Sequence, residues 1–451
     1  MTVLQWVWTE TGKEQVAPEV IYYTLRVLMF LLSFVLEDWA IHELVPSPRQ
    51  RKLAVVLVAS SYVTWTYQSH TFSNSVETLV VAWSLVMIQR ILDNKYRSSK
   101  VSTAILGTLL TFGFFNRITF PVFVFVPLLY LVPHFLNRPF SLVALITSII
   151  GVSLLAISID TAFYSSTPLS LSQLIYNPTI TPLNSLAYNA SAANLSLHGL
   201  HPRYQHLIAS LPLLLGPSLS LLFNSPRLNS LPLLSAISGT ALLSIIPHQE
   251  PRFLLPIIPL VLSSVQLPRT KTLTRTFLVT WIIFNALLGT LMGIYHQGGV
   301  IPAQIWLGQQ NESLGISEVL WWRTYSPPVW LLGGNNITTT DLMGMPFEDM
   351  MNRVDAGVGG CGEQGQALGL VAPASSTELD TWTLGKGGLR ARREGSLRFE
   401  ELWKYRRHLN LDDLDIGEEG VGGTLRRVVG RRGLVVWSVR RTCDNGAGVD
   451  A

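Results

Sequence analysis

Ten long apolar segments limit what this chain can fold into more than any other feature. Each is roughly 15 to 24 residues long, which suits a helix that spans a lipid bilayer. Only helices and closed barrels satisfy their backbone groups inside a membrane. The segments cover residues 21–44, 53–67, 72–92, 101–115, 118–135, 140–159, 204–223, 231–246, 253–267 and 277–294. We therefore expect an all-α polytopic membrane protein, a multi-span helical bundle.

Composition supports this class and divides the chain. Hydrophobic residues make up 48% of the sequence and charged residues only 14%, against about a quarter in ordinary soluble domains. The apolar bias ends near Tyr295, and the remainder is rich in Gly, Arg and Glu. We expect a transmembrane domain over residues 1–295, with a long polar loop over 160–203. Residues 296–451 are expected to form a water-exposed C-terminal domain of mixed secondary structure.

Positive charge indicates the orientation of the spans. Lys and Arg concentrate in every second short loop, which places those loops in the cytosol. The cations are Arg49, Arg51, Lys52, Arg90, Lys95, Arg97, Lys100, Arg138, Arg227, Arg269, Lys271 and Arg275. Because many of the cations before the C-terminal domain fix orientation in this way, the net charge of +4 gives no indication of nucleic-acid binding.

Glycosylation acceptors give a second, independent signal. The N-x-S/T pattern occurs at Asn189, Asn194, Asn311 and Asn336, two in the long loop and two in the C-terminal domain. All four fall on the side opposite the basic loops. We therefore expect the loop, the C-terminal domain and both termini to be luminal.

The most unusual luminal stretch is the run of residues 247–253, Pro-His-Gln-Glu-Pro-Arg-Phe, between two apolar segments. The prolines exclude a continuous helix and favour an extended Glu250. Alternate side chains of extended backbone share a face, so His248, Glu250 and Arg252 should project together. Such a cluster can bind a phosphate or a sugar. A polar turn, with Arg252 paired to Glu250 or to lipid headgroups, fits the spacing as well.

A second polar group enters the luminal half of a span. His70, Asn74 and Glu77 are spaced i, i+4, i+7, which places them on one helical face. A carboxylate there is costly unless it faces protein or a water-filled cavity, so we expect Glu77 to line a pocket. An interhelical hydrogen bond that only fastens two helices is the alternative.

Two further luminal positions complete the candidate residues. Asn116 and Arg117 lie in a tight turn, where Arg117 breaks the positive-inside trend and therefore calls for a local anion. A phosphate or a lipid headgroup would supply it. Asp160 opens the long loop and could form a further wall of a pocket.

Several motifs are missing from the sequence. It contains no Walker-type phosphate loop, no GxGxxG, no CxxC, no HExxH, and no DxD motif beside the membrane. We expect no metal site and no energy-coupled pump. Both cysteines, Cys361 and Cys443, lie in the C-terminal domain, where they could pair if that domain faces an oxidising lumen.

The stretch His248-Gln249-Glu250-Pro251-Arg252-Phe253 resembles the H-x-E-x-R-F signature of glycosyltransferase family 22, mannosyltransferases of the endoplasmic reticulum with the multi-span GT-C fold. Residues 70–77 and 115–121 look most like the GPI mannosyltransferase 4 branch of that family, as do residues 34–44 and 430–437. The resemblance covers nearly the whole chain. It implies transfer of a fourth, α1,2-linked mannose onto the third mannose of a GPI-anchor precursor in the membrane.

What the resemblance implies about chemistry is also specific. The donor would be dolichyl-phosphate mannose, a substrate, and no cofactor would be needed. Arg252 and His248 would hold the departing phosphate, with Glu250 orienting them or a sugar hydroxyl. Phe253, Asn116, Arg117, His70 and Asn74 would line the pocket. The active face would be luminal.

One departure from the family pattern concerns the catalytic base. Family members carry a first span followed by a luminal loop with an H-P-D-E-type motif, whose aspartate is the expected base, and this sequence has no such motif. The catalytic residue is therefore unassigned, and an N-terminally truncated, inactive member is one alternative. A sister mannosyltransferase, acting on the third GPI mannose or on an N-glycan lipid precursor, is another. A transporter or scramblase would require an inverted repeat, and none is visible.

Overall fold

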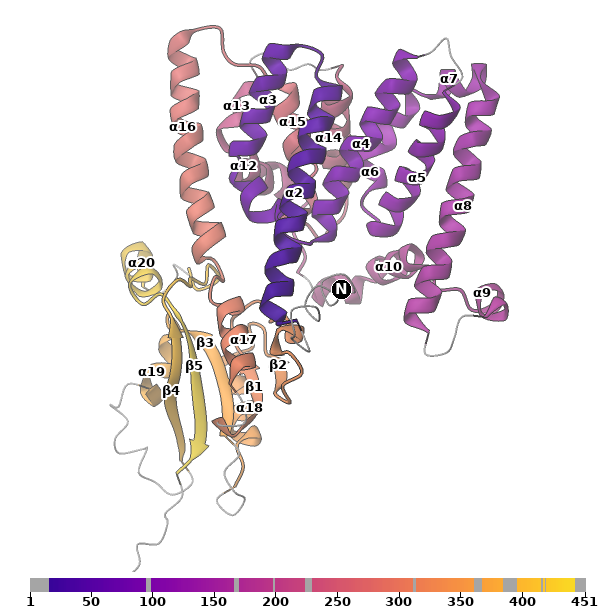
Figure 1. Cartoon of the computed structure of the whole chain (residues 1–451). Helices are drawn as coiled ribbons and strands as arrows, with labels where there is room; N and C mark the ends of the chain where they lie inside the picture. Colours follow the sequence, from indigo (N-terminus) through magenta and orange to yellow (C-terminus); the bar gives the residue numbers. More distant parts are fainter. Residues whose placement is uncertain are drawn as a thin grey trace, which may run out of the picture. The chain divides into compact units, whose positions relative to one another are not determined.

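The computed structural model of the chain describes residues 16–94, 99–165, 170–197, 199–223, 229–310, 314–360, 367–383, 396–414, 417 and 419–442. It separates into two compact units, which are described one at a time (Figure 1). The helical unit comprises Leu25–Gly289, and the sheet unit comprises Thr290–Ala451 together with Met1–Thr24.

Helices of very different lengths build the helical unit. The α-helices are α2 (Pro18–Leu44), α3 (Pro48–Ser60), α4 (Ser73–Asp93), α5 (Lys100–Asn116), α6 (Pro121–Leu129), α7 (Val132–Asn137), α8 (Pro139–Tyr164), α9 (Leu171–Tyr176), α10 (Thr181–Ala190), α11 (Ala192–Leu197), α12 (Leu211–Leu215), α13 (Leu219–Leu222), α14 (Leu231–Leu243), α15 (Ile257–Ser264) and α16 (Lys271–Thr290). Short π and 3-10 turns are η1 (Thr64–Gln68), η2 (His206–Ser210), η3 (Gly216–Ser218), η4 (Pro251–Leu254) and η5 (Leu291–Tyr295).

Among the described residues, 4 helices are long and apolar enough to cross a membrane: Pro18–Leu44, Ser73–Asp93, Pro139–Tyr164 and Lys271–Tyr295. The protein is therefore a multi-pass membrane protein. The other six apolar segments are also helical. Helix α5 covers the whole of segment 101–115, whereas the helices of the other five are shorter than the sequence pattern suggests. Proline explains much of the shortening, because it removes a backbone donor and clashes with the preceding turn. Ten complete spans remain a prediction.

Prolines mark where the helical segments begin and break. Pro48, Pro121 and Pro139 occupy the first residues of α3, α6 and α8, where a missing N–H costs nothing. Within segment 118–135, the chain leaves the helix after Leu129 and resumes at Val132, immediately before another proline. The single apolar run seen in the sequence is thus two helices, α6 and α7.

Helix α4 is the most enclosed of the long helices. In its most apolar window 72% of the residues are buried, against 6% in α8, whose side chains face outward. Helix α14 packs on α6 at very short range, where Ser235 and Ser238 donate hydrogen bonds to the backbone carbonyls of Phe123 and Val122. Small residues allow this approach, as in other membrane bundles.

The sheet unit contains a five-stranded mixed sheet in the order β2-β1-β3-β5-β4. Its strands are β1 (Ile316–Trp321), β2 (Thr338–Asp341), β3 (Ala367–Pro373), β4 (Leu397–Tyr405) and β5 (Leu434–Arg441). Strand β1 runs parallel to β2 and β3, whereas β5 runs antiparallel to β3 and β4. The helices of this unit are α17 (Val300–Gln309), α18 (Phe347–Gly357), α19 (Asp380–Thr383) and α20 (Gly420–Gly430), with the 3-10 turns η7 (Val329–Leu332) and η8 (Thr377–Leu379).

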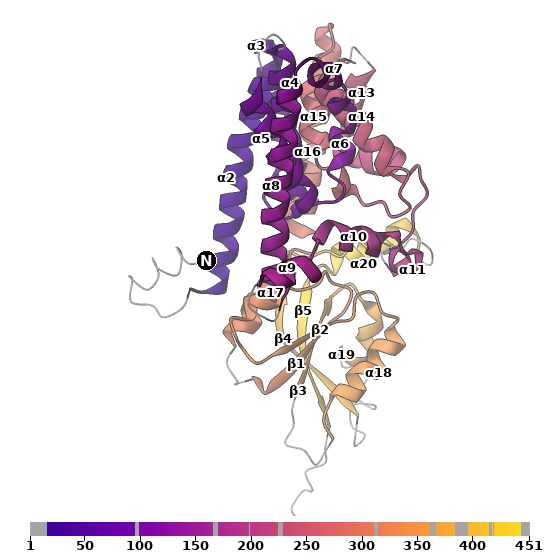
Figure 2. The ribbon, with the colours of Figure 1, turned by 90° about the vertical axis from the view of Figure 1, so that its right-hand side faces the viewer.

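Both faces of this sheet are covered, with α17 and α18 on opposite sides (Figure 2). Neighbouring residues of β1 show the alternation: Leu320 packs toward α18 and Trp321 toward α17. An all-α class is therefore wrong for the whole chain. The sheet lies in the region for which the sequence predicts mixed structure.

Candidate functional site

Residues 247–253 form a tight turn between α14 and α15. Glu250 has extended backbone angles, φ −111° and ψ 143°, as expected of a residue before proline. Pro251 then opens the 3-10 turn η4. The extended backbone ends there, yet His248, Glu250 and Arg252 do contact one another in succession, as the alternation predicts.

Glu250 links the side chains of His248 and Arg252. Its Oε1 accepts a hydrogen bond of 3.0 Å from Nη2 of Arg252, and its Oε2 pairs with Nε of the same guanidinium. The arginine therefore binds the carboxylate in a bidentate manner, through two donors. Its side chain is nevertheless 49% exposed, so the outer edge of the guanidinium remains accessible.

His248 is engaged at both ring nitrogens. Nε2 lies 2.9 Å from Oε1 of Glu250, and Nδ1 lies 3.0 Å from the carbonyl oxygen of Gly199. Both partners are acceptors, so the ring satisfies both only when each nitrogen carries a hydrogen. His248 thus fastens the end of the long loop to the turn and orients Glu250.

Gln249, on the opposite side of the turn, is an anchor that sequence reasoning missed. Its side chain is buried, and Oε1 accepts a 2.9 Å hydrogen bond from the backbone N–H of His206. Nε2 donates to the carbonyls of Arg203, Ser244 and Ile246 at 3.0 to 3.3 Å. The sequence offered one indication of this role: Gln249 alternates with His248 and Glu250, so its side chain should point away from theirs.

Arg117 organises a second polar cluster. Its Nε lies 3.1 Å from Oε2 of Glu77, a fully buried carboxylate, and also donates to the hydroxyl of Thr119 at 3.1 Å. Nη1 donates to Ser73 at 2.9 Å and to Asn74 at 3.2 Å. Glu77 is thus the local anion that the sequence argument for Arg117 required, and it faces protein rather than lipid.

Three more residues belong to this second cluster. Thr119 and Ser73 were not predicted from the sequence, and Asn116 was predicted only to line a pocket. The hydroxyl of Thr119 bridges to Oε1 of Glu77 at 2.6 Å, and Ser73 accepts from Arg117. Asn116 lies beside them and donates to the backbone carbonyl of Ser73 at 2.9 Å. The adjacency of Thr119 and Ser73 to the predicted residues was the only sequence signal.

The two clusters meet at Phe253. Arg117 lies 5.4 Å from the centre of the Phe253 ring and Arg252 lies 6.0 Å from it, both within cation–π range. Burial lowers the pKa of Arg117, Glu77 opposes that effect, and the nearby charge of Arg252 lowers the pKa further. The structure therefore brings together residues from three distant segments, 73–77, 116–119 and 248–253, which we call the Phe253 cluster.

The proximity of the two guanidinium groups leaves donors unused. Nη2 of Arg117 and Nη1 of Arg252 make no hydrogen bond to any residue in the described part of the chain. Two cations with open donors beside one aromatic ring form a site for an anion. A phosphate, which accepts from several N–H groups at once, matches it.

His70 is not part of this site, and the predicted helical face is wrong at that residue. Helix α4 begins only at Ser73, so His70 lies in the preceding turn. Its ring stacks on Phe72, and Nδ1 lies 3.2 Å from Nη1 of Arg26. Burial, together with the charge of Arg26, lowers the pKa of His70 to about 4.

Asp160 and the glycosylation acceptors lie elsewhere. Asp160 accepts a hydrogen bond from the hydroxyl of Thr181, which ties α8 to α10. Among the acceptors, Asn189 and Asn336 are exposed, and Asn194 is partly exposed. Asn311 and both cysteines fall outside the described residues. Within the described ranges, no group of three or more His, Cys, Asp or Glu side chains could hold a metal.

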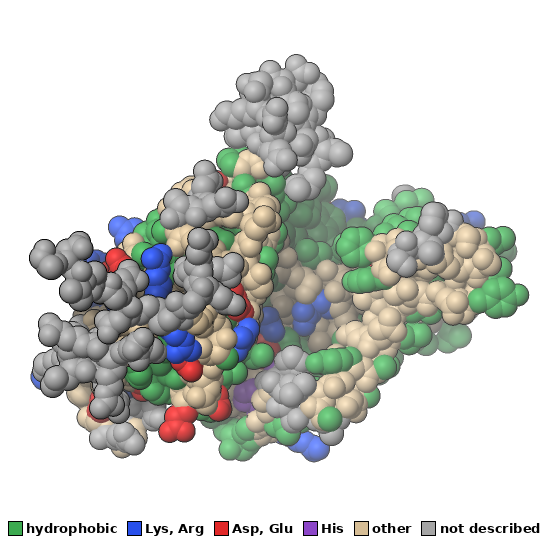
Figure 3. Space-filling view, turned by 90° about the horizontal axis from the view of Figure 1, so that it is seen from below, with side chains coloured by type: hydrophobic (Ala, Val, Ile, Leu, Met, Phe, Trp, Pro, Cys, Tyr) green, Lys and Arg blue, Asp and Glu red, His purple; other side chains and the backbone are tan. Residues whose placement is uncertain are grey.

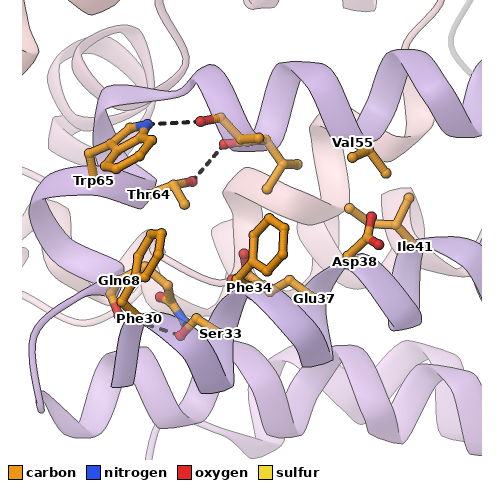
Figure 4. A pocket seen from close by; sticks show the side chains of 12 residues that line it. Phe30, Ser33, Phe34, Glu37, Asp38, Ile41, Val55, Thr64, Trp65 and Gln68 are labelled. Atoms are coloured by element: carbon orange, nitrogen blue, oxygen red, sulfur yellow. Dashed lines mark hydrogen bonds between the residues drawn. The ribbon is translucent and has the colours of Figure 1, made fainter. Parts of the chain in front are cut away.

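A cavity of about 110 Å³ between α2, α3 and η1 shares no lining residue with the two clusters (Figure 4). Its walls are mostly apolar, from residues such as Phe30, Phe34 and Trp65, with Glu37 buried among them. The cavity is too small for a sugar and a lipid phosphate together, so it does not replace the Phe253 cluster as the candidate site.

Comparison with known proteins identifies the family. The model of the Alg9-like mannosyltransferase family matches residues 1–332, which include every residue of the Phe253 cluster. No solved structure matches the chain significantly.

Curated relatives match most of the chain as well. GPI mannosyltransferase 4 of Aspergillus oryzae is 47% identical over 98% of this chain and 87% of its own length. The Emericella nidulans protein of that name is also 47% identical, over 98% of this chain and 86% of its own length. The protein of Saccharomyces cerevisiae is 36% identical over 72% of this chain and 63% of its own length. With the family model and these relatives in agreement, the chain belongs to the Alg9-like mannosyltransferase family.

Proposed function

We propose that this mannosyltransferase adds a fourth, α1,2-linked mannose to the third mannose of a GPI-anchor precursor, with dolichyl-phosphate mannose as donor. The names of the relatives support the GPI acceptor. The observation that carries the donor is the convergence of Arg117 and Arg252 on Phe253, with open N–H donors on both guanidinium groups.

A lipid phosphate is the leaving group of this reaction, and the site is built to hold one. Charge develops on the phosphate oxygen as the bond to the sugar breaks, and fixed cations stabilise that charge without rearranging. Arg252 reaches outward from the turn, and Arg117 supports it from the neighbouring helix end. We assign the phosphate to these two side chains.

The remaining polar residues position the two arginines. Glu250 holds one edge of Arg252, and His248 fixes Glu250 through a hydrogen bond of 2.9 Å. Glu77, Thr119 and Ser73 hold Arg117 in the same way. Because both nitrogens of His248 are occupied, its proposed role is positioning rather than phosphate contact.

The proposed step is a single displacement at the anomeric carbon of the donor mannose. The acceptor 2-hydroxyl oxygen forms the new bond, while the bond from the anomeric carbon to the phosphate oxygen breaks and leaves its electron pair on dolichyl phosphate. Attack from the opposite face inverts the β-linked donor to an α-mannoside. The hydroxyl proton passes to a general base. Glu77 and Glu250 are both held in ion pairs, so neither is assigned that role.

The cellular setting follows from the same proposal. The relatives and the membrane helices support an endoplasmic-reticulum membrane protein with a GT-C-like arrangement of spans. The glycosylation acceptors and the basic loops support a luminal active face. No metal or cofactor enters the proposed step, since the phosphate bond of the donor itself supplies the leaving group.

Analysis of lipid-linked precursors after deletion of the gene tests the acceptor. We expect GPI precursors with three mannoses to accumulate, while N-glycan lipid precursors keep their normal size. Precursors halted at two mannoses would assign the enzyme to the third GPI mannose. A shortened N-glycan precursor would assign it to that pathway and contradict the proposal.

A further inference from the structure

The sheet unit contains a polar cleft, and most of the residues that line it lie beyond the range that the family model matches. Its volume is about 720 Å³, within the range usual for ligand sites. Acidic and basic side chains both line it, including Arg323, Asp413 and Arg427. Both signs of charge are also interspersed over the surface of this unit in Figure 3. Such a mixture suits neither a simple anion nor a simple cation.

Two buried side chains that line the cleft carry unpaired polar atoms. Thr324 is 8% exposed and Asn410 is 1% exposed, and both line the cleft. Neither the hydroxyl of Thr324 nor Nδ2 of Asn410 has a hydrogen-bond partner among the described residues. Buried polar atoms are normally paired, so a ligand or ordered water is expected to meet them.

The orientation of the Asn410 amide is fixed by its other atom. Oδ1 accepts hydrogen bonds from Nε2 of Gln297 at 3.1 Å and from the backbone N–H of Asp412 at 3.2 Å. Nδ2 is therefore the atom that remains, and it carries two unpaired N–H donors at the wall of the cleft. The donors are held in place by groups that do not depend on any ligand.

An acceptor and a cation stand beside these donors. Asp413 accepts a 2.6 Å hydrogen bond from Ser375 through Oδ2, while its Oδ1 lies 3.9 Å from Nη1 of Arg323. Asp413 is 6% exposed, and this burial raises the pKa of its carboxyl. Arg323 is held by Glu378 at 3.0 Å and lies 4.4 Å from the centre of the Trp322 ring.

The backbone at the rim of the cleft is unusual. Arg323 and Met343 both have left-handed φ angles, 55° and 49°, which few residues other than glycine adopt. Arg323 donates its backbone N–H to the carbonyl of Met343 at 2.7 Å, so the two residues hold each other. Local strain of this kind often accompanies a binding site.

We propose that this cleft binds a hexose residue of the acceptor glycan. Each sugar hydroxyl both donates and accepts a hydrogen bond, and the cleft supplies donors from Asn410 and Arg323, an acceptor from Asp413, and the Thr324 hydroxyl, which does both. The choice of a mannose-containing glycan rests on the proposed function. The cleft itself is argued from the sheet unit alone.

Thr324→Val is the matched test, because valine has the shape of threonine and lacks only the hydroxyl. That hydroxyl has no partner among the described residues, so its loss should not reduce the protein's own stability. Ser438→Ala is the control: the Ser438 hydroxyl on β5 is likewise buried without a described partner, but it does not line the cleft.

The measurement is the KM for a trimannosyl GPI acceptor. The full-length protein is expressed from the gene's own chromosomal locus, and membranes are prepared from those cells. Loss of one hydrogen bond to a neutral group should raise this KM about 3- to 10-fold in Thr324→Val. The KM for the donor and kcat should stay unchanged, as should all three values in Ser438→Ala. An unchanged acceptor KM in Thr324→Val, or an equal rise in the control, overturns the proposal.

Direct binding separates this inference from the proposed function. Saturation-transfer NMR with α-mannotriose on the full-length protein in nanodiscs should show contact that weakens in Thr324→Val and persists in Ser438→Ala. This experiment requires no turnover, so it remains informative if no transfer is observed. Equal mannotriose contact in the wild type and Thr324→Val, or none in either, would contradict a sugar site in the cleft.

Discussion

Glu77 shows at the scale of single residues how a membrane helix carries a charge. Its carboxylate is fully buried, yet Oε1 accepts a hydrogen bond from Thr119 and Oε2 forms an ion pair with Arg117 at 3.1 Å. An unpaired charge in this position would cost several kcal/mol. The sequence identified Glu77 as facing protein because an acid in a span has few alternatives. It could not identify the partner, since Arg117 lies 40 residues away in a different turn.

The role of His248 likewise required the structure. The alternation in the turn predicts that His248 and Arg252 share a face, and in the structure both contact the Glu250 carboxylate. Only the structure shows the Gly199 carbonyl at the second ring nitrogen. Because both ring nitrogens are then occupied, we assign His248 to positioning Glu250 rather than to binding the phosphate.

Arg252→Ala should reduce kcat/KM for the donor about 10- to 150-fold, because it removes charge-assisted hydrogen bonds worth about 1.5 to 3 kcal/mol to the leaving phosphate. Arg252→Lys should recover only part of the loss, since an ammonium cannot present two parallel N–H groups. The measurement is the initial rate of mannose transfer in membranes from cells carrying the change at the chromosomal locus.

Arg269→Ala supplies the control for this prediction. Arg269 is also an exposed arginine, but it lies in the loop before α16 and makes no hydrogen bond or ion pair to a described residue. Expression and membrane insertion should be normal in both variants. Near-normal transfer by Arg252→Ala would show that Arg252 does not bind the leaving phosphate and only helps to set the orientation of the chain in the membrane.

At the scale of elements, hydrophobic runs predict that a segment is helical but not where the helix stops. The run at residues 204–223 becomes η2, α12, η3 and α13 in succession. Pro212, Pro217 and the left-handed Gly216 explain those breaks. Their positions are visible in the sequence, whereas the neighbouring helices that make a broken segment tolerable are not.

The contact between α6 and α14 makes a prediction about packing. A Cβ on Gly239 would lie 2.3 Å from the ring of Phe123, a distance that requires the helices to move apart. Gly239→Ala should therefore destabilise the helical unit by about 1 to 3 kcal/mol, because the core has no room for the methyl group. A lower thermal midpoint of the purified protein in detergent, followed by tryptophan fluorescence, would report it.

Gly151→Ala on α8 is the matched control, because a Cβ there would meet nothing within 4 Å. Its thermal midpoint should be unchanged or slightly higher, since alanine favours a helix by up to about 1 kcal/mol over glycine. Equal effects of the two substitutions would show that the short approach of α6 and α14 is not a tight contact.

For the whole molecule, the sequence predicted the membrane class, the mixed C-terminal region and the family, and it could not predict the sheet order. Strands β3 and β5 are neighbours although more than 60 residues separate them, and their pairing depends on contacts across that distance. The cleft that includes Thr324 and Asn410 was missed for a related reason, because its residues are scattered and none belongs to a motif.

Transfer from a defined donor to a defined acceptor tests the central claim most directly. Membranes containing the enzyme, produced from its own locus, would receive labelled dolichyl-phosphate mannose and a GPI precursor with three mannoses. We expect a product that gains one hexose, which α1,2-mannosidase removes, and we expect no such product with a nucleotide-linked mannose once synthesis of the lipid donor is blocked. Transfer only to an acceptor with two GPI mannoses, or only to an N-glycan lipid precursor, would contradict the account.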